Sequence, residues 1–231
     1  MTDEKFLDKK MDRREFLKKA GIGGAGLALG LSGASAFFAN QDSSTKKALD
    51  GDEDISFFGK HQAGITTPMQ KACYLVVLDL HTTDKKEVIQ LFKDWTDYSS
   101  KLVEGELVKK DGSNALLPPT DTGETVGLNP YRLSLTFGVS ADFLKKLGLE
   151  SKRPKLFRDL PPFPKEQLQD KYTGGDIVIQ ACADDEQVAF HAVRNLIRKG
   201  RNKITMKWSK SGFAAIGDRK ETPRNLFGFK D

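Results

Sequence analysis

The sequence predicts an α+β fold of the ferredoxin-like type, as found in dimeric α/β barrels, with a four-stranded antiparallel sheet and helices on one face. Three observations lead to this prediction. Four segments have the length and apolar pattern of strands, two segments carry apolar residues at helical spacing, and the predicted order is β-α-β-(short α)-β-α-β. Because this architecture supports many unrelated activities, it identifies no function by itself.

The first strand and the first long helix are predicted within residues 72–102. Ala72 to Leu80 is apolar on both alternating faces, which is typical of a central strand covered on both sides. Asp84 and Glu87 have the spacing of a capping box and predict the start of a helix. Apolar residues then recur at helical spacing: Val88, Leu91, Phe92, Trp95 and Leu102. The aromatic residues Phe92, Trp95 and Trp208 are interpreted as core.

A second strand follows the loop at 110–130. Apolar Leu133, Leu135 and Phe137 alternate with polar Arg132, Ser134 and Thr136, which predicts a strand with one solvated face. Ala141 to Leu147 predicts a short helix that ends at Gly148. The proline-rich segment from Arg153 to Tyr172 is long enough for a functional loop, and we expect it to line a substrate entrance.

The last two strands enclose the second long helix. Asp176 to Ala183 predicts the third strand, and Asp184 and Asp185 suit the start of a helix, where free N–H groups favour anions. Paired apolar positions form one stripe along this helix, and Gly200 can end it. Ile204 to Ser209 predicts the fourth strand. The sequence therefore places the first and third strands side by side.

Residues 1–36 have the organisation of a twin-arginine export signal. Arg13 and Arg14 are followed by Phe-Leu-Lys, then by a glycine-rich apolar stretch, and Ala34-Ser35-Ala36 supplies a cleavage pattern that ends at Ala36. The stretch is too short for a stable membrane span, which takes about 20 apolar residues. We expect export through the twin-arginine translocon to the periplasm or the extracellular cell envelope, with residues 37–54 as a flexible linker. An uncleaved amphipathic anchor is the alternative.

The charge of the chain does not indicate nucleic-acid binding. The formal net charge is +5 in 231 residues, and part of it lies in residues 1–36. The remaining basic residues are spread along the chain without a nucleic-acid reader motif. Hydrophobic residues make up 38% of the chain, which suits a folded domain with its own core.

Three segments carry a family resemblance: Phe57–Ile65 (FFGKHQAGI), Gly175–Leu196, which begins GDIVIQACADD, and Thr222–Asp231 (TPRNLFGFKD). Together they resemble the dye-decolourising (DyP-type) haem peroxidases, above all the exported iron-uptake branch called deferrochelatases. The resemblance covers residues 55–231. The last segment, from Gly228 to Asp231, is similar to the first four residues of the family's Gly-x-x-Asp-Gly signature.

The resemblance implies two ferredoxin-like domains in one chain, with haem b held mainly by the second. Residues 55–231 then form the N-terminal domain, and the C-terminal haem-binding domain with its axial histidine lies outside the chain. Asp231 takes the place of the family's distal aspartate, which contacts the haem side and moves a proton between the two peroxide oxygens. A carboxylate in such a role typically accelerates a reaction by ~10²–10⁴.

The expected function is that of an exported haem peroxidase. Hydrogen peroxide is its oxidant, a small organic donor or ferrous iron is its reductant, and iron or haem acquisition is its setting. We expect the fragment alone to be inactive. The alternative is a truncated, haemless binding or oligomerisation module. A sheet with one uncovered face would expose Leu, Val and Phe side chains, so we also expect a homo-oligomer.

The remaining reactive residues are interpreted as structural. His191 is interpreted as a structural helix histidine, His81 as a surface residue, and His61 receives no ligand role; no histidine pair has metal-ligand spacing, so no metal site beyond haem iron is predicted. Cys73 and Cys182 are expected to be close, as buried free thiols or as a disulfide, with buried free thiols favoured. The basic segment from Lys199 to Lys203 is interpreted as a solvated turn, with an anion site as the alternative.

Overall fold

The computed structural model describes residues 55–109, 118–214, 222 and 224–230, all within one compact unit, Asp52–Asp231. Four strands form one sheet: β1 (Ala72–Leu80), β2 (Ser134–Val139), β3 (Ile177–Ala183) and β4 (Ile204–Phe213). Their order in the sheet is β2-β3-β1-β4, and every neighbouring pair is antiparallel. The predicted ferredoxin-like sheet is confirmed, including the pairing of β1 with β3.

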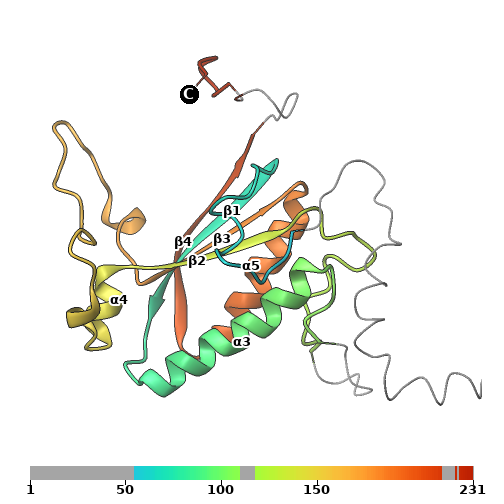
Figure 1. Ribbon diagram of the computed structural model, residues 1–231, viewed down its shortest axis with the longest axis horizontal. Helices are drawn as coiled ribbons and strands as arrows, with labels where there is room; N and C mark the ends of the chain where they lie inside the picture. The colour runs from blue at the N-terminus through green and yellow to red at the C-terminus, as the bar shows by residue number, and fades with distance from the viewer. Residues whose placement is uncertain (1–54, 110–117, 215–221, 223, 231) are drawn as a thin grey trace, which may run out of the picture. The chain divides into compact units, whose positions relative to one another are not determined.

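The two long helices, α3 (Lys85–Val103) and α5 (Glu186–Gly200), lie on the same face of the sheet (Figure 1). The short helix α4 (Ala141–Lys146) follows β2, and two 3₁₀ turns follow it, η1 (Glu150–Lys152) and η2 (Asp170–Tyr172). None of the helices in the described part of the chain is long and apolar enough to cross a bilayer.

Trp95 lies at the centre of the core between the helices and the sheet. Its side chain is 1% exposed, stacks on Phe137 with ring centroids 5.7 Å apart, and donates from Nε1 to the carbonyl of Leu196 at 2.8 Å. The indole therefore links α3 to β2 through apolar contact and to α5 through a hydrogen bond. Since buried tryptophan usually requires a partner for its N–H, this bond explains how the residue fits the core.

The helix starts follow the sequence prediction with one correction. Asp84 caps α3 by accepting from the backbone N–H of Lys86 at 2.8 Å, and Asp185 caps α5 by accepting from Val188 N at 3.1 Å. The capping box predicted from Asp84 and Glu87 was wrong in its second half. Glu87 hydrogen-bonds the hydroxyl of Thr82, and that hydroxyl oxygen accepts from Asp84 N. Thr82 thus replaces Glu87 as the acceptor for the cap residue.

The open face, defined here as the sheet face opposite α3 and α5, is partly covered by the chain itself. Val77 is 8% exposed, and Gly175, with a φ of 121°, lies so close that an added Cβ would meet Val77 Cγ1 at 2.2 Å. On β2, Thr136 donates to the carbonyl of Ala63 at 2.6 Å, and Ser134 is buried. The prediction of a solvated face on β2 was therefore wrong, and the apolar face predicted to be bare is covered at Val77 but partly exposed at Leu75 and Val178.

Trp208 also departs from its prediction as a core residue. It pairs with Val77 across β1 and β4, so its half-buried side chain lies on the open face, whereas Val76 and Leu78 point into the core. Its indole Nε1 is buried and has no hydrogen-bond partner among the described residues.

The free edge of β2 is closed by a side chain. Gln62 donates from Nε2 to the carbonyl of Phe137 at 3.1 Å and accepts from Phe137 N at Oε1 at 2.9 Å. One amide side chain thus satisfies both outward backbone groups of Phe137, which another strand would otherwise use. Such protection limits edge-to-edge association of sheets.

Candidate functional site

Residues 224–230, which belong to the third of the family-like segments, fold into a tight turn. Asn225 accepts at Oδ1 from the N–H groups of Phe227 and Phe229 at 3.0 and 3.1 Å, and its carbonyl accepts from Gly228 N at 2.9 Å. Gly228 has a φ of 86°, a region that favours glycine. The Arg224 side chain donates to the carbonyl of Gly228 at 2.8 Å, and the backbones of Arg224 and Lys230 pair as an isolated antiparallel β-bridge. The turn therefore fixes the backbone up to the residue before Asp231.

Four of the residues predicted from the sequence lie outside the described residues. They are Asp231, the arginine pair Arg13 and Arg14, and the cleavage position Ala36. Their roles stay predictions.

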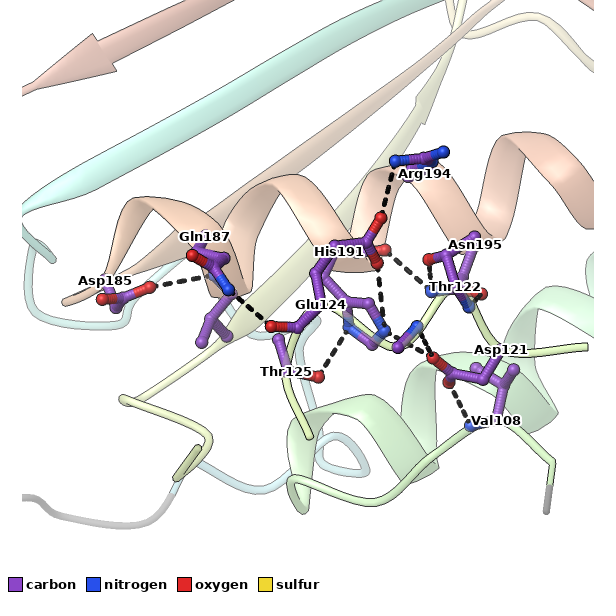
Figure 2. Close-up of polar contacts among 12 residues, drawn as sticks. Val108, Asp121, Thr122, Glu124, Thr125, Asp185, Gln187, His191, Arg194 and Asn195 are labelled. Carbon is purple, nitrogen blue, oxygen red and sulfur yellow. Dashed lines mark hydrogen bonds and ion pairs between the residues drawn. The ribbon is translucent and has the colours of Figure 1, made fainter. Parts of the chain in front are cut away.

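A connected group of polar side chains, the His191 network drawn in Figure 2, joins α5 to the loop at 118–128. His191 is 1% exposed, and its Nε2 lies 2.8 Å from Asp121 Oδ1, while its Nδ1 lies 3.0 Å from Thr125 Oγ1. Asn195, one helical turn later, donates to Thr122 Oγ1 at 2.9 Å and accepts from Thr122 N at 3.2 Å. Both ring nitrogens of His191 are occupied within the protein, which confirms its structural interpretation.

Asp121 anchors this network in the loop. Its Oδ1 also accepts from Gly123 N at 2.7 Å and its Oδ2 from Val108 N at 2.9 Å. Burial alone would raise the pKa of Asp121, but the hydrogen bonds from His191, Gly123 and Val108 outweigh it and hold this pKa below its ordinary value. The carboxylate is therefore ionised and acts as the fixed acceptor at the centre of the network.

Glu124 completes the network on the solvent side. Arg194 donates to Glu124 Oε1 at 2.7 Å, and Glu124 Oε2 lies 3.8 Å from His191 Nε2. Burial would raise the pKa of Glu124, but hydrogen bonding to Thr122 and the charge of Arg194 lower it overall. Sequence reasoning missed Asp121, Glu124 and Asn195. The one available signal was the helical i, i+4 spacing of His191 and Asn195.

None of the three histidines, all of which lie among the described residues, lines either of the two hollows described below. His191 has no free ring nitrogen, His81 is exposed with Nε2 2.5 Å from Thr205 Oγ1, and His61 is exposed on the loop before β1. A hollow of about 680 Å³ is lined by polar and acidic side chains with two aromatics: Tyr74, Asp184, Asp185, Glu186, Gln187, Phe190 and Ser211. No histidine lines it. Within the described ranges no three His, Cys, Asp or Glu side chains could together hold a metal ion.

Cys73 and Cys182 are directly opposite each other in the register of β1 and β3, and both are half-buried free thiols. The prediction that they lie close together is confirmed, and both are free thiols in this structure. The prediction that they are buried was wrong, because both side chains lie on the open face of the sheet and are only half-buried.

A second hollow of about 360 Å³ lies at the end of α5 and is lined by Lys199, Arg201 and Asn202 of the basic segment. Lys199 Nζ lies 3.3 Å from Asp94 Oδ2 and forms an ion pair with it, whereas Arg201 and Asn202 are exposed. The other lining residues are Tyr98, Pro118, Thr120, Asn195 and Arg198. The solvated-turn interpretation agrees with the exposure of Arg201 and Asn202.

The proline-rich loop from Arg153 to Tyr172 is exposed along its whole length. Tyr172 contacts β4, with Lys210 Nζ 4.9 Å from the centre of its ring. Neither of the two hollows described above is lined by this loop. Its role at a substrate entrance stays a prediction.

Residues 62–214 match the family model described as Dyp-type peroxidase, N-terminal. The deferrochelatase of Escherichia coli O157:H7 is 34% identical over 225 residues, which cover 95% of this chain and 52% of that protein. The deferrochelatase of Yersinia pseudotuberculosis is 37% identical over 182 residues, covering 76% of this chain and 41% of that protein. The chain thus spans about half the length of the curated relatives it matches.

Solved structures show the same relationship. DtpA from Streptomyces lividans, solved as an oxyferrous/water mixed complex, has 36% identity and a TM-score of 0.69, over 78% of this chain and 48% of that chain. The DyP-type peroxidase from Cellulomonas bogoriensis has 32% identity and a TM-score of 0.65 over the same shares.

Proposed function

The chain belongs to the Dyp-type peroxidase family, and from this premise we propose that it is the N-terminal part of an exported, haem-dependent peroxidase. The enzyme reduces hydrogen peroxide and oxidises an organic donor or ferrous iron. The observation that carries the proposal is the family match at residues 62–214, followed by the TPRNLFGFKD segment at 222–231. Relatives named deferrochelatase support iron or haem acquisition as the setting.

In this proposal haem b and its axial histidine belong to a C-terminal domain outside the 231 residues. Two observations support that division. Among the described residues, the hollow of about 680 Å³ is lined without a histidine. The curated relatives are also about twice as long as the part that matches.

Asp231 is the residue of this chain that we assign to the reaction. Cleavage of the peroxide O–O bond is easier when a proton leaves one oxygen and reaches the other, and a carboxylate can carry it. The turn at 224–230 supports this role, since the contacts of Arg224 and Asn225 limit the conformations of the backbone that leads to Asp231.

Export is the second part of the proposal, and Arg13, Arg14 and Ala36 carry it. The twin-arginine translocon is the partner, and the mature chain begins at Phe37 in the periplasm or the cell envelope. Cell fractionation tests this directly. Replacing both arginines by lysine should leave the uncleaved chain in the cytoplasm, while mass spectrometry of the exported wild type should find Phe37 at its N-terminus.

The peroxidase proposal is tested on the gene expressed from its own start codon to its own stop codon. We expect a Soret band after haem loading and peroxide-dependent oxidation of an organic dye. Asp231→Asn should keep the Soret band and lower kcat/KM by ~10²–10⁴. The matched control is Asp97→Asn, an exposed acid on α3 that pairs only with Lys101 among the described residues, and it should leave both readouts unchanged.

Two outcomes would contradict the proposal. Full turnover in the Asp231→Asn variant would remove the role of Asp231. No Soret band in the natural gene product would support the alternative, a haemless binding or oligomerisation module.

A further inference from the structure

We propose that Cys73 and Cys182 form a peroxide-sensitive dithiol, which closes to a disulfide between the two central strands of the sheet. The Dyp-type family assignment plays no part in this inference. It starts from the register of β1 and β3, in which the two cysteines are direct partners.

The geometry of the pair suits a disulfide. Directly opposed residues of antiparallel strands have Cα atoms about 4.5–5.5 Å apart and side chains on the same face. A disulfide forms when the Cα atoms are about 4.4–6.8 Å apart, so the strands need no large movement. Both sulfurs lie on the open face, since the neighbouring residues Ala72 and Ala183 are buried on the helix side.

The two thiols differ in how open their surroundings are. On β4 the partner of Cys73 is Gly212, and a Cβ added there would meet no atom within 4 Å, so the space beside Cys73 is open. On β2 the partner of Cys182 is Ser134, which is buried and accepts from Gln70 Nε2 at 2.8 Å. A small oxidant therefore reaches Cys73 more easily than Cys182.

The pKa values of the two thiols also favour oxidation of Cys73 before Cys182. The hydrogen bond from Cys182 to the sulfur of Cys73 lowers the pKa of Cys73 to about 7, against the opposing effect of burial. The same hydrogen bond raises the pKa of Cys182, and burial adds to that rise. A thiolate is the nucleophile in thiol oxidation, so Cys73 attacks first.

Few charged groups face this pair. Lys210 on β4 lies on the same face, two residues from Gly212, and beyond Cys182 on the β3 side Asp184 is paired with Arg132 at 3.1 Å. From β2, Ser134 and Thr136 contribute hydroxyl groups only. Lys210 Nζ lies over the ring of Tyr172, 4.9 Å from its centre, and the ion pair of Asp184 and Arg132 is internally balanced, so Cys182 is the main influence on the Cys73 thiol.

The reaction balances with hydrogen peroxide as the oxidant. The thiolate of Cys73 attacks one peroxide oxygen, the O–O bond breaks, and the products are a sulfenic acid on Cys73 and one water molecule after proton uptake. The sulfur of Cys182 then attacks the sulfenic sulfur, an S–S bond forms, the S–O bond breaks, and a second water leaves. Two thiols are oxidised for each peroxide reduced, and a small thiol reductant reverses the change.

The test uses the full 231-residue chain, reduced, freed of reductant and treated with hydrogen peroxide. We expect the intact mass to fall by two hydrogen atoms, non-reducing peptide maps to contain one linked pair, Cys73–Cys182, and dithiothreitol to restore both thiols. The rate should rise as the pH passes about 7. Cys182→Ser should stop at a sulfenic acid, seen as one added oxygen that dimedone traps.

The matched variant Cys73→Ser should react about tenfold more slowly at pH 7, because an ordinary cysteine has only a few per cent of thiolate there. An oxygen adduct in the wild type without an internal linkage would overturn the proposal, as would disulfides formed only between chains. Equal rates for Cys73→Ser and wild type would also overturn it. The peptide map of the wild type needs no variant, so it decides the question even where a variant folds poorly.

Discussion

Replacing Asp121 by asparagine tests whether the His191 network holds the loop at 118–128 onto α5. The carboxylate accepts from His191 Nε2 and Gly123 N at Oδ1 and from Val108 N at Oδ2. An asparagine side chain has one oxygen, so its NH₂ group must face at least one of these donors. One bond to a charged acceptor contributes about 1.5–3 kcal/mol, and a buried donor without a partner costs about 1–3 kcal/mol. We therefore expect Asp121→Asn to lower the free energy of unfolding by about 2–4 kcal/mol.

Urea unfolding followed by circular dichroism measures this loss as a lower midpoint at an unchanged slope. The matched control is Asp97→Asn, which removes an exposed i, i+4 ion pair with Lys101 and should cost only about 0.3–0.5 kcal/mol. If Asp121→Asn unfolds within about 0.5 kcal/mol of the wild type, the network contributes little and the reasoning is wrong.

The stability difference between wild type and Asp121→Asn should also depend on pH, in a direction set by the pKa of Asp121. The pKa of Asp121 is lower in the folded state than its ordinary value, so its ionised form contributes stability above the ordinary range, about 4, and loses it as the pH falls through the folded-state pKa. The difference in unfolding free energy between wild type and Asp121→Asn should therefore shrink as the pH falls from about 5 towards about 2. A difference that is constant over this range would contradict the assignment.

Three further substitutions test the packing. Gly175→Ala should destabilise the fold by more than about 2 kcal/mol, because its Cβ would lie 2.2 Å from Val77 Cγ1 and its φ is 121°; urea midpoints measure this. Gly123→Ala, with a φ of 79° but no atom within 4 Å, should cost about 1 kcal/mol in the same assay, which separates backbone strain from collision. Trp95→Phe loses the hydrogen bond to Leu196 and some volume, and should lower the unfolding free energy by about 2–3 kcal/mol with the ellipticity of the folded state kept.

The fold was predictable from sequence because its strands and helices have clear periodicity. Ala72–Leu80 has the bounds of β1, and the predicted strand at Ile204–Ser209 lies within β4. The remainder of β4 was missed because Lys210, Ser211 and Gly212 carry a weak strand signal, and their pairing with β1 determines their conformation. Contacts with β1, and not the local sequence, therefore determine the strand conformation of that segment.

The polar contacts were much less predictable. Asp121 and His191 lie far apart in the sequence, and no local pattern relates a loop aspartate to a helix histidine. The position of Trp208 was mistaken for a similar reason. The register shift between Val77 and Leu78 in the pairing of β1 with β4 sets which face each β4 side chain occupies, and such an irregularity leaves no signal in composition.

The strand order β2-β3-β1-β4 has a consequence for how the chain reaches its fold. Only β2 and β3 are neighbours both in the sheet and along the chain. Ala72, at the start of β1, pairs with Ala183 and Phe213, so the first strand to be synthesised has no partner until roughly a hundred further residues have followed. The pairing of β1 with β3, and that of β1 with β4, must each overcome the entropy of closing a long loop before any contact compensates that cost. A nascent chain that ends before β3 therefore has an unpaired apolar strand, and chaperones that bind extended apolar segments have their longest opportunity during that interval.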